Sequence, residues 1–140
     1  MTHSQNFIDE LTYELNGAAI EVHKSLGPGL LEDVYMHCLK HELSLRKIRF
    51  QSEMSVPVVY KEIEVPTKLR CDFLVEGAVC VEIKSVKELL PVHKAQLLTY
   101  MKLLEVPKGV LYNFNVVNLF HEGQQTYVNE YFRMLPHGEM

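Results

Sequence analysis

The chain has 140 residues, of which 47% are hydrophobic and 23% are charged, and it contains no tryptophan. This length fits one domain of ordinary size, so a single domain is expected over residues 1–140. The near-average composition excludes a disordered, collagen-like or low-complexity chain. With 14 basic and 18 acidic residues the formal net charge is −4, which argues against strong overall attraction to nucleic acid or to an anionic membrane.

No feature of the sequence indicates export or a membrane partner. The first residues, 1–6, are polar and lack the basic and apolar regions of a secretory signal. Apolar runs are short, far below the ~18–20 residues that a membrane-spanning helix needs. The odd cysteine count, Cys38, Cys71 and Cys80 in apolar sequence, indicates reduced buried thiols. These observations predict a cytoplasmic protein.

Two amphipathic helices are predicted at the N-terminus. Apolar residues at three- and four-residue spacing predict the first over residues 6–26. A Gly-Pro-Gly turn at 27–29 ends it, because glycine caps a helix and proline cannot continue the hydrogen-bond ladder. The second helix is predicted over residues 30–47, with Glu32 and Asp33 in its first turn, where the helix dipole favours acidic side chains.

The rest of the chain reads as strands around one further helix. Segments rich in β-branched residues predict strands over residues 55–60, 63–75, 78–86, 109–114, 116–120 and 126–134. Glu76 and Gly77 predict a hairpin turn, and Pro91 fits the first turn of a helix over residues 91–105. This order predicts an α/β fold with a central mixed β-sheet flanked by helices and an N-terminal helical pair.

Three charged residues interrupt the apolar strands near the hairpin: Asp72, Glu82 and Lys84. Acidic side chains are rarely buried without a partner, because removing an ion from water costs several kcal/mol. Two carboxylates and an ammonium group at a strand end suit a hard divalent cation such as Mg²⁺, and the lysine could orient a water or neutralise a phosphate. The alternative, from spacing alone, is a structural lysine–glutamate ion pair on a half-exposed strand.

A shared site requires a particular hairpin register. A two-residue loop would pair Asp72 with Val81 and place Asp72 and Glu82 on opposite faces of the sheet. An odd loop or a bulge would place Asp72 opposite Glu82 instead. In that register Cys71 and Cys80 have opposite strand parity, so no thiolate pair is expected.

The same stretch resembles a known nuclease superfamily. Asp72 followed by Glu82-Ile83-Lys84 resembles the PD-(D/E)xK nucleases, and residues 29–35 (GLLEDVY) resemble the name-giving motif of the small GxxExxY family. Other matching features are His23, Arg70, the Gln96-x-x-x-Tyr100 spacing and the segment 111–114. The resemblance runs in one collinear order over about residues 10–120. It departs from the pattern at Cys71, where the name-giving proline is absent.

The resemblance implies a restriction-endonuclease-like core and Mg²⁺- or Mn²⁺-dependent hydrolysis of DNA or RNA. The implied metal ligands are Asp72, Glu82, the backbone carbonyl of Ile83 and, as an additional acid, Glu32. The resemblance gives Lys84 the role of the base that faces the water or the phosphate. The residues it implies for orienting the site or contacting substrate are Gln96, Tyr100, Arg70 and His23.

Structural roles remain open for several of these residues. Glu32 could serve only the helix dipole, His23 could be a hydrogen-bonded, partly buried histidine, and Arg70 could pair with an acid. Gln96 and Tyr100 could be packing residues. The alternative function is a catalytically inactive nuclease fold that binds nucleic acid or protein, and a third reading is a site for another metal or an organic ligand.

Five basic residues lie in the same half of the sequence: Lys68, Arg70, Lys84, Lys87 and Lys94. They could create a local positive field inside an acidic protein, so contact with DNA or RNA is expected to be weak and confined to the site. A homodimer is compatible with this reading, because a small nuclease often needs two sites to cut a duplex.

Overall fold

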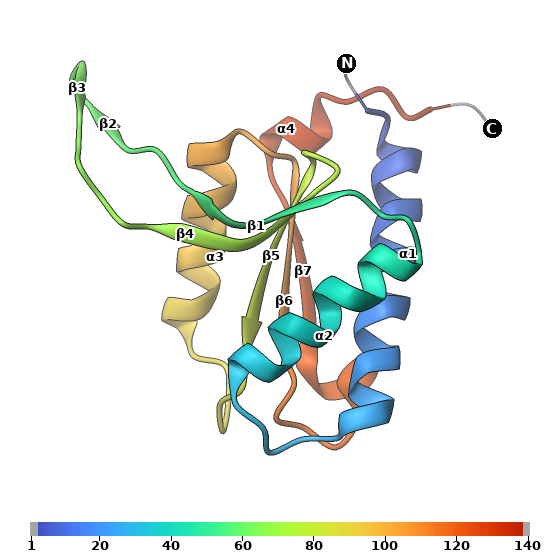
Figure 1. The fold of residues 1–140 in the computed structure, drawn as a ribbon. Helices are drawn as coiled ribbons and strands as arrows, with labels where there is room; N and C mark the ends of the chain where they lie inside the picture. Colours follow the sequence, from blue (N-terminus) through green and yellow to red (C-terminus); the bar gives the residue numbers. More distant parts are fainter. Residues whose placement is uncertain (1–2, 139–140) are drawn as a thin grey trace.

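The computed structural model describes residues 3–138 and contains a mixed β-sheet with helices on both faces (Figure 1). The helices are α1 (Gln5–Leu26), α2 (Glu32–Leu45), α3 (Pro91–Leu104) and the short α4 (Glu130–Arg133), with a π-helical turn η1 (Leu119–Gly123). The strands are β1 (Phe50–Ser55), β2 (Val59–Tyr60), β3 (Ile63–Glu64), β4 (Arg70–Val75), β5 (Val79–Lys84), β6 (Lys108–Asn113) and β7 (Gln124–Val128).

The main sheet has five strands in the order β1-β4-β5-β6-β7. Strands β5 and β6 are parallel and are connected through α3, whereas the other neighbouring pairs are antiparallel. Strands β2 and β3 form a separate two-stranded ribbon that projects away from the body of the protein (Figure 1). The predicted α/β class, with a central mixed sheet flanked by helices and an N-terminal helical pair, is confirmed.

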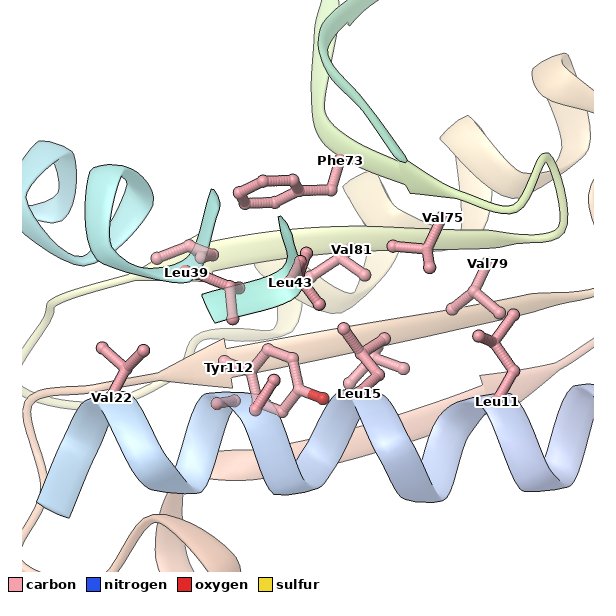
Figure 2. Close-up of a cluster of buried hydrophobic side chains, with 14 of the residues drawn as sticks. Leu11, Leu15, Val22, Leu39, Leu43, Phe73, Val75, Val79, Val81 and Tyr112 are labelled. Carbon is pink, nitrogen blue, oxygen red and sulfur yellow. The ribbon is translucent and has the colours of Figure 1, made fainter. Parts of the chain in front are cut away.

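Two apolar layers hold the sheet between its helices. On one face, alternate side chains of β4, β5 and β6 pack against α1 and α2, and Figure 2 shows leucine side chains of both helices directed at the strands. On the other face, α3 contributes Leu97, Tyr100 and Met101, which pack with Leu74 and Leu111 of the sheet. Each fully buried apolar side chain stabilises the fold by roughly 1.5–3 kcal/mol. Burial on both faces explains why β5 and β6 read as nearly continuous apolar runs.

A tyrosine fixes the turn between the two N-terminal helices. The ring of Tyr35 is fully buried and stacks on Phe114, with centroids 4.5 Å apart. Its hydroxyl donates a hydrogen bond to the carbonyl of Gly27 at 2.6 Å and accepts one from the amide of Leu30 at 3.2 Å. Because Glu32 is the first residue of α2, these contacts also set where that carboxylate lies.

The predicted strands before the hairpin are partly wrong. Strand β1 was not predicted, because this edge strand alternates half-buried and exposed residues and contains Gln51 and Glu53. The predicted strand over 55–60 is reduced to β2, apart from Ser55 at the end of β1, and the one over 63–75 is divided into β3 and β4. The interruption contains Pro66, which cannot donate to a strand ladder.

The predicted strands near the C-terminus are also partly wrong. Residues 116–120 form a bend and the start of η1, where the Asn118 side chain accepts a hydrogen bond from the amide of His121 at 3.0 Å. Strand β7 ends at Val128, and the side chain of Asn129 caps α4. Asparagine caps compete with strand formation because their side chains satisfy the first amides of a helical turn.

The helices of residues 3–138 include none whose length and hydropathy would let it cross a membrane.

The Tyr35 hydroxyl provides a test of the helix turn. Tyr35→Phe keeps the stacked ring but leaves the carbonyl of Gly27 and the amide of Leu30 without this partner. We expect the free energy of unfolding to fall by about 1–2 kcal/mol, measured by urea denaturation. Tyr13→Phe, on a side chain that is 77% exposed, is the control and should change stability by less than about 0.5 kcal/mol. Equal stabilities of the two variants would contradict the assigned role.

Candidate functional site

The β4–β5 hairpin has the register that a shared carboxylate site requires. The paired residues are Phe73 with Val81, Leu74 with Cys80 and Val75 with Val79. Continuing this register places Asp72 across from Glu82. The turn holds three residues, because Ala78 is added to a tight turn in which Glu76 and Gly77 have φ of 51° and 64°. The amide of Ala78 closes that turn on the carbonyl of Val75 at 2.9 Å. The hairpin therefore has the odd loop that a shared site requires.

Asp72 and Glu82 exchange hydrogen bonds with the two strands. Glu82 Oε2 accepts from the backbone amide of Asp72 at 2.7 Å, and Asp72 Oδ2 accepts from the backbone amide of Ile83 at 2.7 Å. Charge-assisted bonds of this kind are short and about twice as strong as neutral ones. The carboxylate of Glu82 is therefore held by the amide of Asp72, and the carboxylate of Asp72 by the amide of Ile83, the residue after Glu82. The two acids lie side by side.

Burial and mutual repulsion disfavour the charged forms of the two acids. Burial, and then the charge of the neighbouring Asp72, raise the pKa of Glu82 to about 8. Burial also raises the pKa of Asp72, against the lowering effects of the Ile83 amide and of the Lys84 charge. A cation bound between the two carboxylates would relieve this repulsion and favour both charged forms.

Lys84 is within electrostatic range of the pair and forms no ion pair with it. It is half-buried at the end of β5, and its charge lowers the pKa of both Asp72 and Glu82. The ion pairs within residues 3–138 do not include it. The alternative of a structural lysine–glutamate ion pair is therefore not what the structure contains, and the ammonium group remains available to a further partner.

Glu32 is near the pair but not in contact with it. It is exposed at the first position of α2, and its charge raises the pKa of both Asp72 and Glu82. Tyr100 of α3 is buried in the apolar layer between α3 and the sheet. Burial and then the charge of Glu82 raise the pKa of its hydroxyl. Gln96, one helical turn before Tyr100, is half-buried.

Two predicted site residues are not brought to the carboxylates. His23 is buried, and its Nε2 lies 2.8 Å from the carbonyl of Val116, which ties α1 to the loop after β6. Its ring lies 6.2 Å from that of Phe114, within the layer on the α1 face of the sheet. Arg70 is exposed at the start of β4, and among residues 3–138 it forms no ion pair with Asp72.

Glu53 is a carboxylate near the site that sequence reasoning missed. The β1–β4 register pairs Ser52 with Phe73 and Met54 with Cys71, so Glu53 lies opposite Asp72 with a left-handed φ of 52°. Its charge raises the pKa of Asp72. No signal in the sequence could have located it, because its position depends on pairing between strands far apart in the chain.

Asn113 is a second missed residue, and it organises the loop behind Lys84. Its buried side chain accepts from the amides of Val86 at 3.1 Å and Asn115 at 3.2 Å, and donates to the carbonyl of Val86 at 3.0 Å. The amide of Phe114 donates to the carbonyl of Lys84 at 2.9 Å. A polar residue one position before the end of the apolar segment 109–114 was the available signal.

The expectation that Cys71 and Cys80 point to opposite faces is wrong. Both are fully buried in the apolar layer under α3, and a hydrogen bond with the Cys71 thiol, together with burial, raises the pKa of Cys80. Both are free thiols. The paired residues of the hairpin end at Phe73 and Val81, and the Asp72 amide bonds to the Glu82 side chain, so the strand parity of the hairpin does not extend to Cys71.

The donor set suits a hard cation with retained waters. Among residues 3–138 no group of three or more His, Cys, Asp or Glu side chains is arranged to hold a metal ion. Two carboxylates are nevertheless adjacent, and Asp72 Oδ1 and Glu82 Oε1 receive no hydrogen bond from the described residues. Mg²⁺ is typically bound by one or two carboxylates plus water and substrate oxygens, so these residues fit such an ion.

Comparison with known proteins identifies the family. A sequence model of the PD-(D/E)XK nuclease superfamily matches residues 9–126, which is most of the chain. No curated protein and no solved structure matches. The superfamily resemblance is thus confirmed, whereas the narrower likeness to the GxxExxY family stays a prediction.

The raised pKa of Glu82 predicts an unusual pH dependence of stability. The pKa of Glu82 is about 8 in the folded protein, above its ordinary value of 4.5. An acid with a raised pKa contributes stability that is fully present below its ordinary pKa. This stability is lost as the pH rises through the pKa of the folded protein. We therefore expect the Tm of metal-free protein to fall between pH 5 and pH 9 by several degrees, at roughly 3–6 °C per kcal/mol. Differential scanning calorimetry measures this.

Glu82→Gln is the variant that isolates this effect. It should flatten the fall in Tm across the same pH range, because the amide does not ionise. Glu10→Gln, at an exposed position of α1, should keep the wild-type profile. Parallel Tm profiles for wild type and Glu82→Gln would show that Glu82 does not titrate in this range.

Proposed function

Because the chain belongs to the PD-(D/E)XK nuclease superfamily, we propose that it is a divalent-metal-dependent nuclease with Asp72, Glu82 and Lys84 as its core site. The observation that carries this proposal is the pair of 2.7 Å hydrogen bonds that lock the two carboxylates side by side. Holding two carboxylates together against their mutual repulsion lowers the stability of the folded protein. Such an arrangement is typical of sites organised for function rather than for folding.

The metal is proposed to be Mg²⁺ or Mn²⁺, held by Asp72, Glu82 and the backbone carbonyl of Ile83, with Glu32 as an additional acid. When bound, such an ion supplies Lewis-acid stabilisation of the negative charge on the scissile phosphate. Glu32 lies outside direct contact with the pair, so its contribution would reach the ion through a water molecule.

The roles of the remaining residues follow from their positions. The Lys84 ammonium group orients the attacking water or neutralises a phosphate oxygen. Its charge acts on both carboxylates, and it forms no ion pair with either of them. Tyr100 and Gln96 line the α3 side and orient the site, with the Tyr100 hydroxyl close enough to sense the charge of Glu82. Arg70, exposed two residues before Asp72, contacts substrate phosphate. His23 serves the scaffold through Val116.

Nucleic acid approaches the α3 side of the sheet in this proposal. Helices α1 and α2 together carry seven acidic and two basic residues. Residues 68–104 carry six basic and four acidic residues, and two of those four acids are the proposed ligands Asp72 and Glu82. Of the acids in α1 and α2 only Glu32 is assigned to the site, and residues 68–104 carry a net positive charge, which supports attraction of phosphates there.

Metal-dependent cleavage is the direct test of this function. Purified protein should cut DNA or RNA in the presence of Mg²⁺ or Mn²⁺ and lose activity with EDTA. Asp72→Asn, Glu82→Gln and Lys84→Met should each lower the rate by roughly 10²-fold or more, as expected for groups that act in the transition state. Glu10→Gln is the matched control for removal of an acid and should retain full activity.

Isothermal titration with Mn²⁺ separates binding from catalysis. Wild type should bind the ion, and Asp72→Asn should not. If wild type and Asp72→Asn cleave equally, the activity belongs to a contaminant. Nucleic-acid binding without cleavage or metal affinity would instead establish the inactive binding module.

A further inference from the structure

Three parts of the chain meet at one end of the main sheet. They are the loop after β5, the loop after β6 and the turn between α1 and α2 (Figure 1). Lys84 ends β5 and pairs with Asn113 at the end of β6. Glu32 begins α2 directly after the turn. The lysine and the additional acid of the proposed site therefore come from segments that are far apart in the sequence.

Helix α2 begins at an apolar N-cap residue. Its N-cap is Leu31, whose side chain cannot accept a hydrogen bond from the first amides of the helix. Leu31 and Glu32 are both exposed, so burial does not hold them in place either. A helix end of this kind opens easily. The position of Glu32 therefore depends on contacts that the preceding turn makes with the rest of the protein.

Two polar side chains connect this turn to the end of the sheet. Asn115 Oδ1 accepts a hydrogen bond from the amide of Gly29 at 3.1 Å. The hydroxyl of Ser85 donates one to the carbonyl of Leu30 at 2.6 Å. These contacts join residues that are 86 and 55 positions apart in the sequence. Tyr35 also holds the turn, but it does so from within α2, so Ser85 and Asn115 supply the connection to the sheet.

A buried asparagine fixes both of these side chains. Asn113 is 2% exposed, and its side chain exchanges hydrogen bonds with the amide and the carbonyl of Val86, at 3.1 and 3.0 Å. The same side-chain oxygen accepts from the amide of Asn115 at 3.2 Å, and Asn115 Nδ2 donates to the carbonyl of Val86 at 3.3 Å. Ser85 and Asn115 are therefore anchored beside the strand end that carries Lys84.

The residue that follows the turn carries a charge that the site repels. The charge of Glu32 raises the pKa of both Asp72 and Glu82, so the three acids lie within electrostatic range of one another. Like charges at this range disfavour one another. An exposed acid at an apolar helix start is free to move away from such repulsion unless its backbone is held. The hydrogen bonds of Ser85 and Asn115 hold that backbone.

We propose that Ser85 and Asn115 are positioning residues that hold Glu32 near the acid pair, where its carboxylate assists binding of the divalent metal. Their role depends on the metal site proposed above. Both side chains are engaged with the backbone of the turn, so they act through Glu32 and contact neither metal nor substrate. Their effect on metal affinity should therefore disappear when Glu32 is replaced.

Isothermal titration with Mn²⁺ tests this dependence. Ser85→Ala combined with Asn115→Ala should raise the dissociation constant roughly 10-fold, which is typical for residues that orient metal-binding groups. Glu32→Gln should raise it by a similar factor. The triple variant should bind no more weakly than Glu32→Gln alone, because residues that act through one another are not additive. Circular dichroism checks that each variant is folded.

Asn118→Ala is the matched control for this titration. It removes a side-chain hydrogen bond to the backbone in the same connection after β6, from the amide of His121 at 3.0 Å. That bond does not reach the turn between α1 and α2, so this variant should bind Mn²⁺ as wild type does.

Amide hydrogen exchange in the metal-free protein tests the connection independently of the metal. The amide of Val34 bonds to the carbonyl of Leu31 at 3.1 Å in the first turn of α2. It should exchange roughly 10-fold faster when Ser85 and Asn115 are both alanine, because two hydrogen bonds to the preceding turn are lost. Amides within α3 should keep their wild-type rates.

The results that would overturn the proposal are distinct. Unchanged exchange at Val34 would show that the two side chains do not hold the helix start. Equal Mn²⁺ affinity of wild type and the double alanine variant, or a triple variant weaker than Glu32→Gln, would show that they do not act through Glu32. A wild type without Mn²⁺ affinity would remove the metal site and this role with it. Metal binding without cleavage would contradict only the proposed nuclease activity.

Discussion

The fold near the site depends on two hydrogen bonds from backbone amides to carboxylates. The amide of Asp72 bonds to Glu82, and the amide of Ile83 bonds to Asp72, each at 2.7 Å. Because these amides are used by side chains, the regular ladder between β4 and β5 stops at Asp72. Beyond this point Cys71 lies in the apolar layer with Cys80. The acid pair therefore lies directly beside the apolar packing of the α3 face.

Residues from both faces of the sheet surround the acid pair. On the α1 face, Tyr35 fixes the turn that positions Glu32. At the carboxyl end of β6, Asn113 holds the loop that follows Lys84. On the other face, Tyr100 lies in the apolar layer, and the charge of Glu82 raises its pKa after burial does. These contacts order the elements around two acids whose charges repel one another.

Sequence patterns predicted the elements that bury one or both faces. The helices over 6–26 and 91–105 and the strands over 78–86 and 109–114 have strong apolar periodicity, and the structure contains each of them within a few residues. The strand predictions from sequence patterns failed where polar side chains form hydrogen bonds with the backbone or where a strand is largely polar. Strand β1 is a polar edge strand, and Asn118 and Asn129 start helical turns in segments predicted as strands. A local period carries no information about such side-chain-to-backbone bonds.

By itself the sequence determined the fold class, the presence of the hairpin and the residue types of the candidate site, because apolar periodicity and turn residues are local properties. Only the tertiary structure decided which of these residues meet. It brought Glu53 opposite Asp72 and directed His23 into the packing of α1. It also left Glu32 within electrostatic range but out of contact. Distances between elements arise from packing of whole layers, and residue spacing along the chain does not encode them.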